Sequence, residues 1–180
     1  MKESVGSPPS GKPVAVAPRK RLSGPARKAW LVTHIVSVSA WIGIDVVLAV
    51  LVFTALATDD RMVAATCYQA LQLFAVWPLL AAGLVCLISG VVLGWGSKYG
   101  VVRYWWVVVK LGLNLLLTTL GVLALRPAVN EAVDYGRALV SGGPATGVPD
   151  LIFPPIVSPA CLLLAVVLSV YKPWGRVKKA

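Results

Sequence analysis

Charged residues are scarce in this chain of 180 residues, where only 13% are Asp, Glu, Lys or Arg and 58% are hydrophobic. Soluble domains carry about 25% charged residues, which keep their surfaces in water. Acidic residues are the scarcest charged group, at 7 against 17 basic ones, and there is one histidine. The composition therefore excludes an ordinary soluble globule.

The usual signatures of enzyme chemistry are also missing. One histidine and three cysteines cannot form a His/Cys cluster at metal-ligand spacing. No phosphate-binding glycine loop and no GxSxG nucleophile motif occur in the sequence. We therefore expect no metal site and identify no catalytic residues, which favours a protein that is not an enzyme over an enzyme.

Hydrophobic residues are instead collected into four long blocks, and each block is close to or above the roughly 20 residues needed to span a bilayer. Because these blocks are apolar on every side, a chain this small cannot cover them with its own residues, and lipid must do so. We expect an all-α fold, an integral membrane four-helix bundle, with spans at about 30–56, 70–95, 104–125 and 151–171.

The remaining segments are polar. Residues 1–29 are rich in Pro, Ser, Gly and basic residues and predict a disordered tail, and residues 172–180 form a second basic tail. The segment 127–150 is too polar to span and too rich in glycine to be one stable helix, so we expect a long external loop. Pro78 should kink the second span, and the fourth should be regular only from Pro159, after Pro154 and Pro155.

The distribution of Lys and Arg predicts the orientation. Seven precede the first block, two lie between the second and third, and four follow the fourth, whereas only Arg61, Arg126 and Arg137 lie on the opposite side. Because cytoplasmic flanks carry the excess of basic residues, we expect a multi-pass plasma-membrane protein with both termini cytoplasmic. These basic residues flank apolar spans, so they indicate contact with anionic lipid headgroups and not with nucleic acid.

Polar side chains inside the expected spans form two stripes. Ionisable residues are costly in a membrane and usually face the bundle interior, which makes them candidates for function. Spacings of three and four residues place the members of each stripe on one helix face. The first stripe is His34, Ser37, Trp41 and Asp45, and the second is Lys110, Asn114, Thr118 and Gly121.

The depth of each residue follows from a helical rise of about 1.5 Å per residue. His34 lies roughly 6 Å and Lys110 roughly 9 Å from the cytoplasmic boundary, so the two could meet. Asp45 lies roughly 22 Å deep, within reach of Asn114 or Thr118 directly or through water.

Each ionisable residue has two interpretations. His34 either bonds a backbone carbonyl in a structural role or serves as a ligand or proton carrier. Lys110 either extends its ammonium to the headgroups or belongs to a site. Asp45 is either a protonated, hydrogen-bonded structural residue or part of a proton path.

Three stretches resemble a known family: His34 through Trp41-Ile42-Gly43, WPLLAAGLVCLISGVVLG at 77–94, and KYGVVRYWWVVVKLGLNLLL at 98–117. They resemble a bacterial domain-of-unknown-function family of four-helix membrane proteins, distantly similar to HemJ-type protoporphyrinogen oxidases and CopD-type copper-resistance proteins. The resemblance covers about residues 30–129.

In HemJ-type proteins a first-helix histidine and a third-helix lysine accompany haem b, and His34 and Lys110 match these positions. The resemblance therefore implies a haem or porphyrin site near the cytoplasmic side. Two positions depart from the pattern, since Ile44 follows Gly43 and Tyr104 stands where relatives often have histidine. With one histidine in the chain, haem would have at most one histidine ligand, and a histidine-rich copper site is excluded.

Three functions remain open at this point: a plasma-membrane protein with a polar intramembrane site, a haem b or porphyrin-binding protein using His34 and Lys110, and an accessory or scaffold subunit of a membrane complex. In the last case the partner is another membrane protein or a second copy of the chain. A transporter is a weaker alternative.

Overall fold

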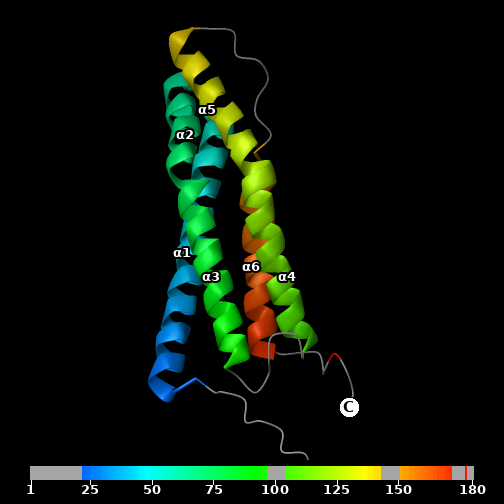
Figure 1. Ribbon diagram of the computed structural model, residues 1–180. Helices are drawn as coiled ribbons and strands as arrows, with labels where there is room; N and C mark the ends of the chain where they lie inside the picture. Colours follow the sequence, from blue (N-terminus) through cyan, green and yellow to red (C-terminus); the bar gives the residue numbers. More distant parts are fainter. Residues whose placement is uncertain (1–21, 97–103, 143–150, 172–176, 178–180) are drawn as a thin grey trace, which may run out of the picture.

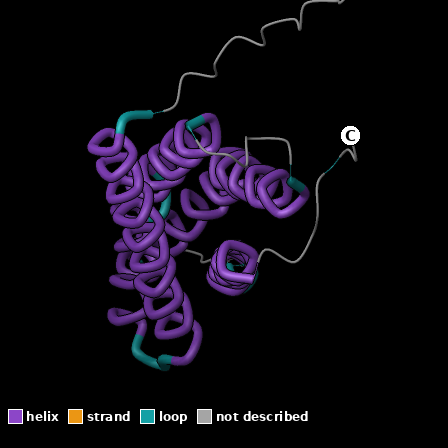
Figure 2. The backbone as a smooth tube through the Cα atoms, turned by 90° about the horizontal axis from the view of Figure 1, so that it is seen from below, coloured by secondary structure: helices purple, strands orange, loops and turns teal. Residues whose placement is uncertain are grey.

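The computed structural model describes residues 22–96, 104–142, 151–171 and 177, and every element in these ranges is a helix (Figures 1 and 2). This confirms the all-α prediction for the described chain. The helices are α1 Gly24–Ala57, α2 Arg61–Phe74, α3 Trp77–Trp95, α4 Trp105–Leu120, the π-helical turn η1 Gly121–Leu125, α5 Arg126–Ser141 and α6 Pro154–Tyr171.

Two pairs of these helices continue one another. The segment Arg61–Trp95 contains α2 and α3 and is 35 residues long, and Trp105–Ser141 contains α4, η1 and α5 and is 37 residues long. Together with α1 and α6 they give four helices long and apolar enough to cross a membrane. The four helices expected from the apolar blocks are therefore present, with the length and hydropathy that crossing a membrane requires.

Contacts between the helices separate the molecule into two parts. In the first part α1 packs against α3, α3 against α4, α4 against α6, and α6 against α1. In the second part α2 packs against α5 and α1. Figure 1 shows α2 and α5 extending the bundle away from the end where α1 begins and α6 finishes.

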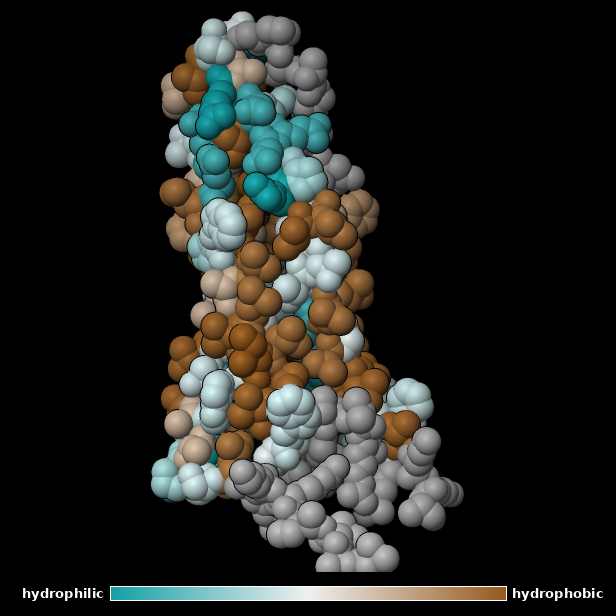
Figure 3. Space-filling view, in the orientation of Figure 1, coloured by the Kyte–Doolittle hydropathy of each residue, from teal (hydrophilic) through white to brown (hydrophobic). Residues whose placement is uncertain are grey.

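The surface hydropathy follows the same division. The face seen in Figure 3 is apolar along most of the bundle, and hydrophilic residues gather over α2 and α5. Large apolar side chains such as Val32, Leu123 and Val170 are more than half exposed on the membrane helices. An apolar surface of this extent fits a lipid environment.

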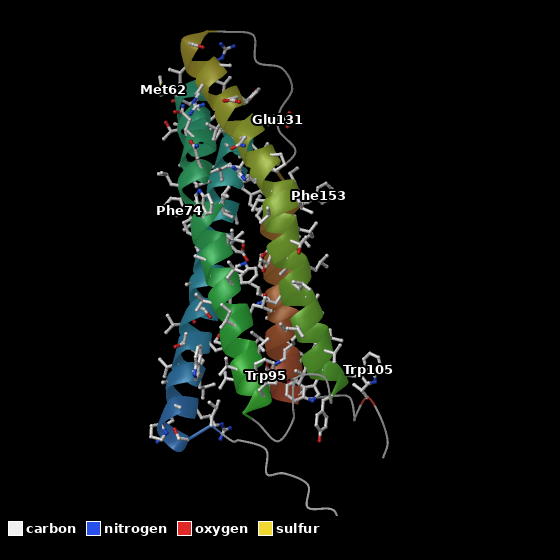
Figure 4. All side chains as sticks on the ribbon, in the orientation of Figure 1. Met62, Phe74, Trp95, Trp105, Glu131 and Phe153 are labelled. Carbon is white, nitrogen blue, oxygen red and sulfur yellow. The ribbon has the colours of Figure 1, made fainter. Side chains whose placement is uncertain are left out.

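Exposed aromatic residues mark two levels along the bundle. Trp95 and Trp105 lie at the end of the bundle where α1 begins and α6 finishes (Figure 4), and both are exposed. Trp77 is exposed where α3 begins. The rise from Trp77 to Trp95 is about 27 Å, close to the roughly 30 Å of a hydrocarbon core. The helices α2 and α5 lie outside the part of the bundle between these two levels (Figure 1).

The prediction of an external loop at 127–150 is wrong for most of that segment, because Arg126–Ser141 forms α5. An apolar stripe of α5 packs against α2 and stabilises the helix, and the charged residues of α5 face outward. The stripe consists of Val129, Ala132, Val133 and Gly136, which are all buried. Gly142 ends the helix in the left-handed conformation at φ 71°, where glycine is favoured. Residues 143–150 lie outside the described residues.

Other boundaries also differ from those expected. Helix α1 begins at Gly24, so the last six residues assigned to the disordered tail are helical, with Pro25 in the first turn where its missing N–H costs nothing. The second helix starts nine residues early, at Arg61, where the Asp60 side chain accepts hydrogen bonds from the Met62 and Val63 N–H groups.

Prolines act mainly at helix starts. Pro78 lies in the first turn of α3, directly after the break at 75–76, as the sequence predicts. Helix α6 is regular from Pro154 and not only from Pro159, because its first two prolines occupy the first turn. Pro127 follows the π-turn, in which the Arg126 N–H bonds the Gly121 carbonyl five residues back. A wider turn relieves the clash between a proline ring and the preceding turn.

A close contact joins α2 and α5 at Gly136. A β-carbon at this position would lie 3.0 Å from the Ala65 carbonyl oxygen and 3.1 Å from Tyr68 Cβ. Beside it the rings of Tyr68 and Tyr135 pack edge to face, with centroids 5.5 Å apart. Glycine therefore lets the two helices approach closely.

We predict that Gly136→Ala lowers the free energy of unfolding by about 1–3 kcal/mol, because a backbone carbonyl cannot move aside easily. The matched control is Gly112→Ala in α4, where no atom lies within 4 Å of the added carbon. This control should be neutral or stabilising by up to about 1 kcal/mol. Unfolding in mixed detergent micelles, followed by circular dichroism, measures both. Equal shifts for the two variants would contradict the contact.

Candidate functional site

His34 of α1 is held against α3 by its ring. Its Nδ1 lies 3.1 Å from the Cys86 carbonyl oxygen and 3.0 Å from Ser89 Oγ. Because a carbonyl only accepts, this hydrogen bond requires the proton on Nδ1, and Nε2 of the neutral ring then keeps its lone pair. The ring also lies on Gly90, whose added β-carbon would be 3.3 Å from His34 Cε1. The ring orientation is thus fixed by α3.

The Cys86 thiol lies at the centre of this group. Its sulfur is 3.9 Å from His34 Nδ1 and within hydrogen-bonding reach of the Ser37 and Asn114 side chains. Ser89 Oγ donates to the Val85 carbonyl at 2.6 Å, so its lone pairs are available to the histidine N–H. Three helices, α1, α3 and α4, therefore contribute to one polar cluster.

Lys110 of α4 points toward α6. Its Nζ donates to Ser169 Oγ at 2.8 Å and lies 4.7 Å from the centre of the buried Trp106 ring. The Lys110 ammonium is close enough to interact electrostatically with His34. Direct contact of His34 with Lys110 stays a prediction, and one hydrogen-bond partner of Lys110 comes from the fourth membrane helix.

Asp45 is 1% exposed and bonds a residue that the sequence analysis did not identify. Ser158 of α6 donates to its Oδ2 at 2.8 Å. Asn114 and Thr118, the partners expected for Asp45, instead bond each other weakly at 3.4 Å. The partner differs because α6 packs directly on α1.

Trp41 is also 1% exposed and lies between the two polar groups of α1. The six-membered edge of its indole packs on Gly83, whose added β-carbon would be 3.0 Å from Trp41 Cζ3 and 3.1 Å from Thr118 Oγ1. Its Nε1 is buried and has no acceptor among the described residues. Trp41 therefore separates a His34 cluster, nearer the start of α1, from an Asp45 pair nearer the middle of the bundle.

Sequence reasoning found both stripes but missed their partners on α3 and α6. Cys86 and Ser89 are spaced like neighbours on one helix face, and Ser158 and Ser169 are small polar residues in an apolar span. Such residues do not stand out by charge, yet they are the side chains that join membrane helices. No group of three or more His, Cys, Asp or Glu side chains that could hold a metal ion occurs within the described ranges.

No protein-family model, curated protein or solved structure matches this chain.

We predict that Ser158→Ala lowers the free energy of unfolding by about 1 kcal/mol, a typical value for a hydrogen bond between membrane helices. The control is Ser141→Ala, an exposed serine that bonds only within its own helix. Detergent-induced unfolding measures both variants. If Ser158→Ala unfolds at the same detergent fraction as the parent chain, the Asp45 pair does not stabilise the bundle.

Proposed function

We propose that this chain is a multi-pass plasma-membrane protein, with both termini in the cytoplasm, that binds haem b or a related porphyrin at His34. The observation that carries the proposal is the hydrogen bonding of His34 Nδ1 to the Cys86 carbonyl and Ser89. Histidines that ligate metals almost always donate their other ring N–H to a carbonyl or carboxylate, which fixes the ring and strengthens the ligand.

The donor set around His34 fits a haem with a single protein ligand. Nε2 of the neutral ring can coordinate iron, and haem iron is commonly held by one histidine. Lys110 brings a positive charge near the ring, which suits a propionate. Bound haem b would supply one-electron or oxygen chemistry, whereas the protein residues orient the ligand and balance its charge.

Loading of such a macrocycle requires the helices to separate. The cavities at Trp41 and at Leu48 do not include His34, and Gly90 and Ser89 lie directly against the imidazole. The α1–α3 contact has to stay closed at His34, since it holds the ring through Nδ1, so room for the macrocycle has to come from the Nε2 side of the ring.

Titration of the purified full-length chain with haemin, followed by absorption spectroscopy, tests this function. We expect a Soret band that saturates at one haem per chain and is lost in His34→Ala. Ser89→Ala should weaken the affinity about tenfold, as for other residues that orient a ligand. The control Asp45→Asn lies outside the cluster and should bind like the parent chain. Absence of the band, or an unchanged band in His34→Ala, would overturn the proposal.

A second candidate is an accessory subunit of a membrane complex. It is favoured by α2 and α5, which extend a helical pair with exposed Asp134 and Arg137 beyond the membrane part. The polar pairs would then only lock the bundle. Purification in mild detergent should in that case retain a stoichiometric membrane partner or a second copy, and a monomer that binds haemin would decide against it.

A further inference from the structure

A crevice of about 100 Å³ lies between α3 and the region where α4 continues into η1. Its inner part is formed by buried Trp41, and its outer part by Trp77, which is 70% exposed, and by exposed Arg126. Thr118 and Gly121 contribute from α4 and η1, and aliphatic side chains supply most of the remaining lining. The crevice is separate from the His34 cluster.

The side chain that forms the inner wall of the crevice carries an unused hydrogen-bond donor. Trp41 Nε1 is buried and has no acceptor among the described residues. A buried donor left without a partner is costly, so an acceptor that reaches Nε1 from the adjoining crevice would bind favourably. The indole cannot easily turn away, because its other edge is packed on Gly83 and Thr118.

The outer part offers a positive charge at the membrane boundary. The Arg126 guanidinium makes no hydrogen bond or ion pair with any residue in the described ranges. From Trp105 to Arg126 the chain rises about 31 Å, so Arg126 lies at the level of lipid headgroups. Its side chain leans back over the preceding helical turn, toward Gly121 and the crevice.

We propose that this crevice binds one anionic phospholipid. Arg126 pairs with the phosphate, the exposed Trp77 lies beside the headgroup, and an ester carbonyl below the phosphate accepts the Trp41 N–H. The aliphatic lining takes the first part of an acyl chain. A free phosphate ion fits poorly, because it would lose its hydration against these apolar walls. Basic pockets between membrane helices bind lipid headgroups in this way.

The π-turn explains why the crevice lies where it does. Gly121 carries no side chain, and a β-carbon there would meet no atom within 4 Å. The widened turn that follows also displaces Val122 and Arg126 from the positions of a regular α-helix. A larger side chain at 121 can therefore fill the crevice without disturbing the packing around it.

Native mass spectrometry of the full-length chain in detergent tests the proposal, with added dioleoylphosphatidylglycerol and, separately, zwitterionic dioleoylphosphatidylcholine. We expect one phosphatidylglycerol per chain, bound more tightly than phosphatidylcholine. Arg126→Gln should weaken phosphatidylglycerol binding about tenfold, the effect of losing one hydrogen bond to a charged group. Gly121→Leu should block binding, and Trp41→Phe should weaken it several-fold for both lipids.

The matched control is Arg137→Gln, which removes an exposed arginine of α5 outside the crevice. Equal loss of binding in Arg126→Gln and Arg137→Gln, or equal affinity for the two lipids in every variant, would overturn the proposal. Circular dichroism and size-exclusion chromatography confirm folding of each variant. Arg126 is exposed, so Arg126→Gln should fold like the parent chain. Its phosphatidylglycerol affinity therefore tests the proposal even if Gly121→Leu or Trp41→Phe does not fold.

Discussion

The hydrocarbon core of a membrane offers no hydrogen-bond partner to the backbone, and the rest of this structure depends on that constraint. Backbone groups in each apolar block must be paired within helices, and each proline within or beside a span must be accommodated. Pro78 and Pro154 do this by starting helices. Pro127 follows the π-turn at Gly121–Leu125, which keeps α4 and α5 continuous. The same π-turn lines the crevice beside Trp41.

Packing between the spans follows from the same constraint. Lipid tails are as apolar as leucine, so the hydrophobic effect does not hold membrane helices together, and close packing and polar pairs must do so. Among the described residues, hydrogen-bonded side-chain pairs join the helices in this way. His34 with Ser89 joins α1 to α3, and Asp45 with Ser158 joins α1 to α6. Lys110 with Ser169 joins α4 to α6. A residue that locks a bundle can also bind a ligand when it keeps an unused lone pair, as His34 does at Nε2.

The sequence predicted the spans well because twenty apolar residues in a row have few alternative structures. It predicted the polar stripes because His34, Asp45 and Lys110 stand out against an apolar background. It did not predict α5, since the charges at Glu131, Asp134 and Arg137 concealed the buried stripe, and stabilisation comes from α2, which is far away in sequence. Nor did it predict Ser158 as the partner of Asp45, because helical periodicity gives the face of a residue and not the neighbouring helix.

In the four-span topology that we propose, α2 and α5 extend from the face opposite the start of α1 and the end of α6 (Figure 1). Single cysteines at Asp134→Cys and Ser23→Cys, in a chain whose Cys67, Cys86 and Cys161 are replaced by alanine, test it most directly. A membrane-impermeant maleimide should label Asp134→Cys in intact cells and Ser23→Cys only after the cells are permeabilised. Labelling of both positions in intact cells, or of Ser23→Cys alone, would rule out this topology.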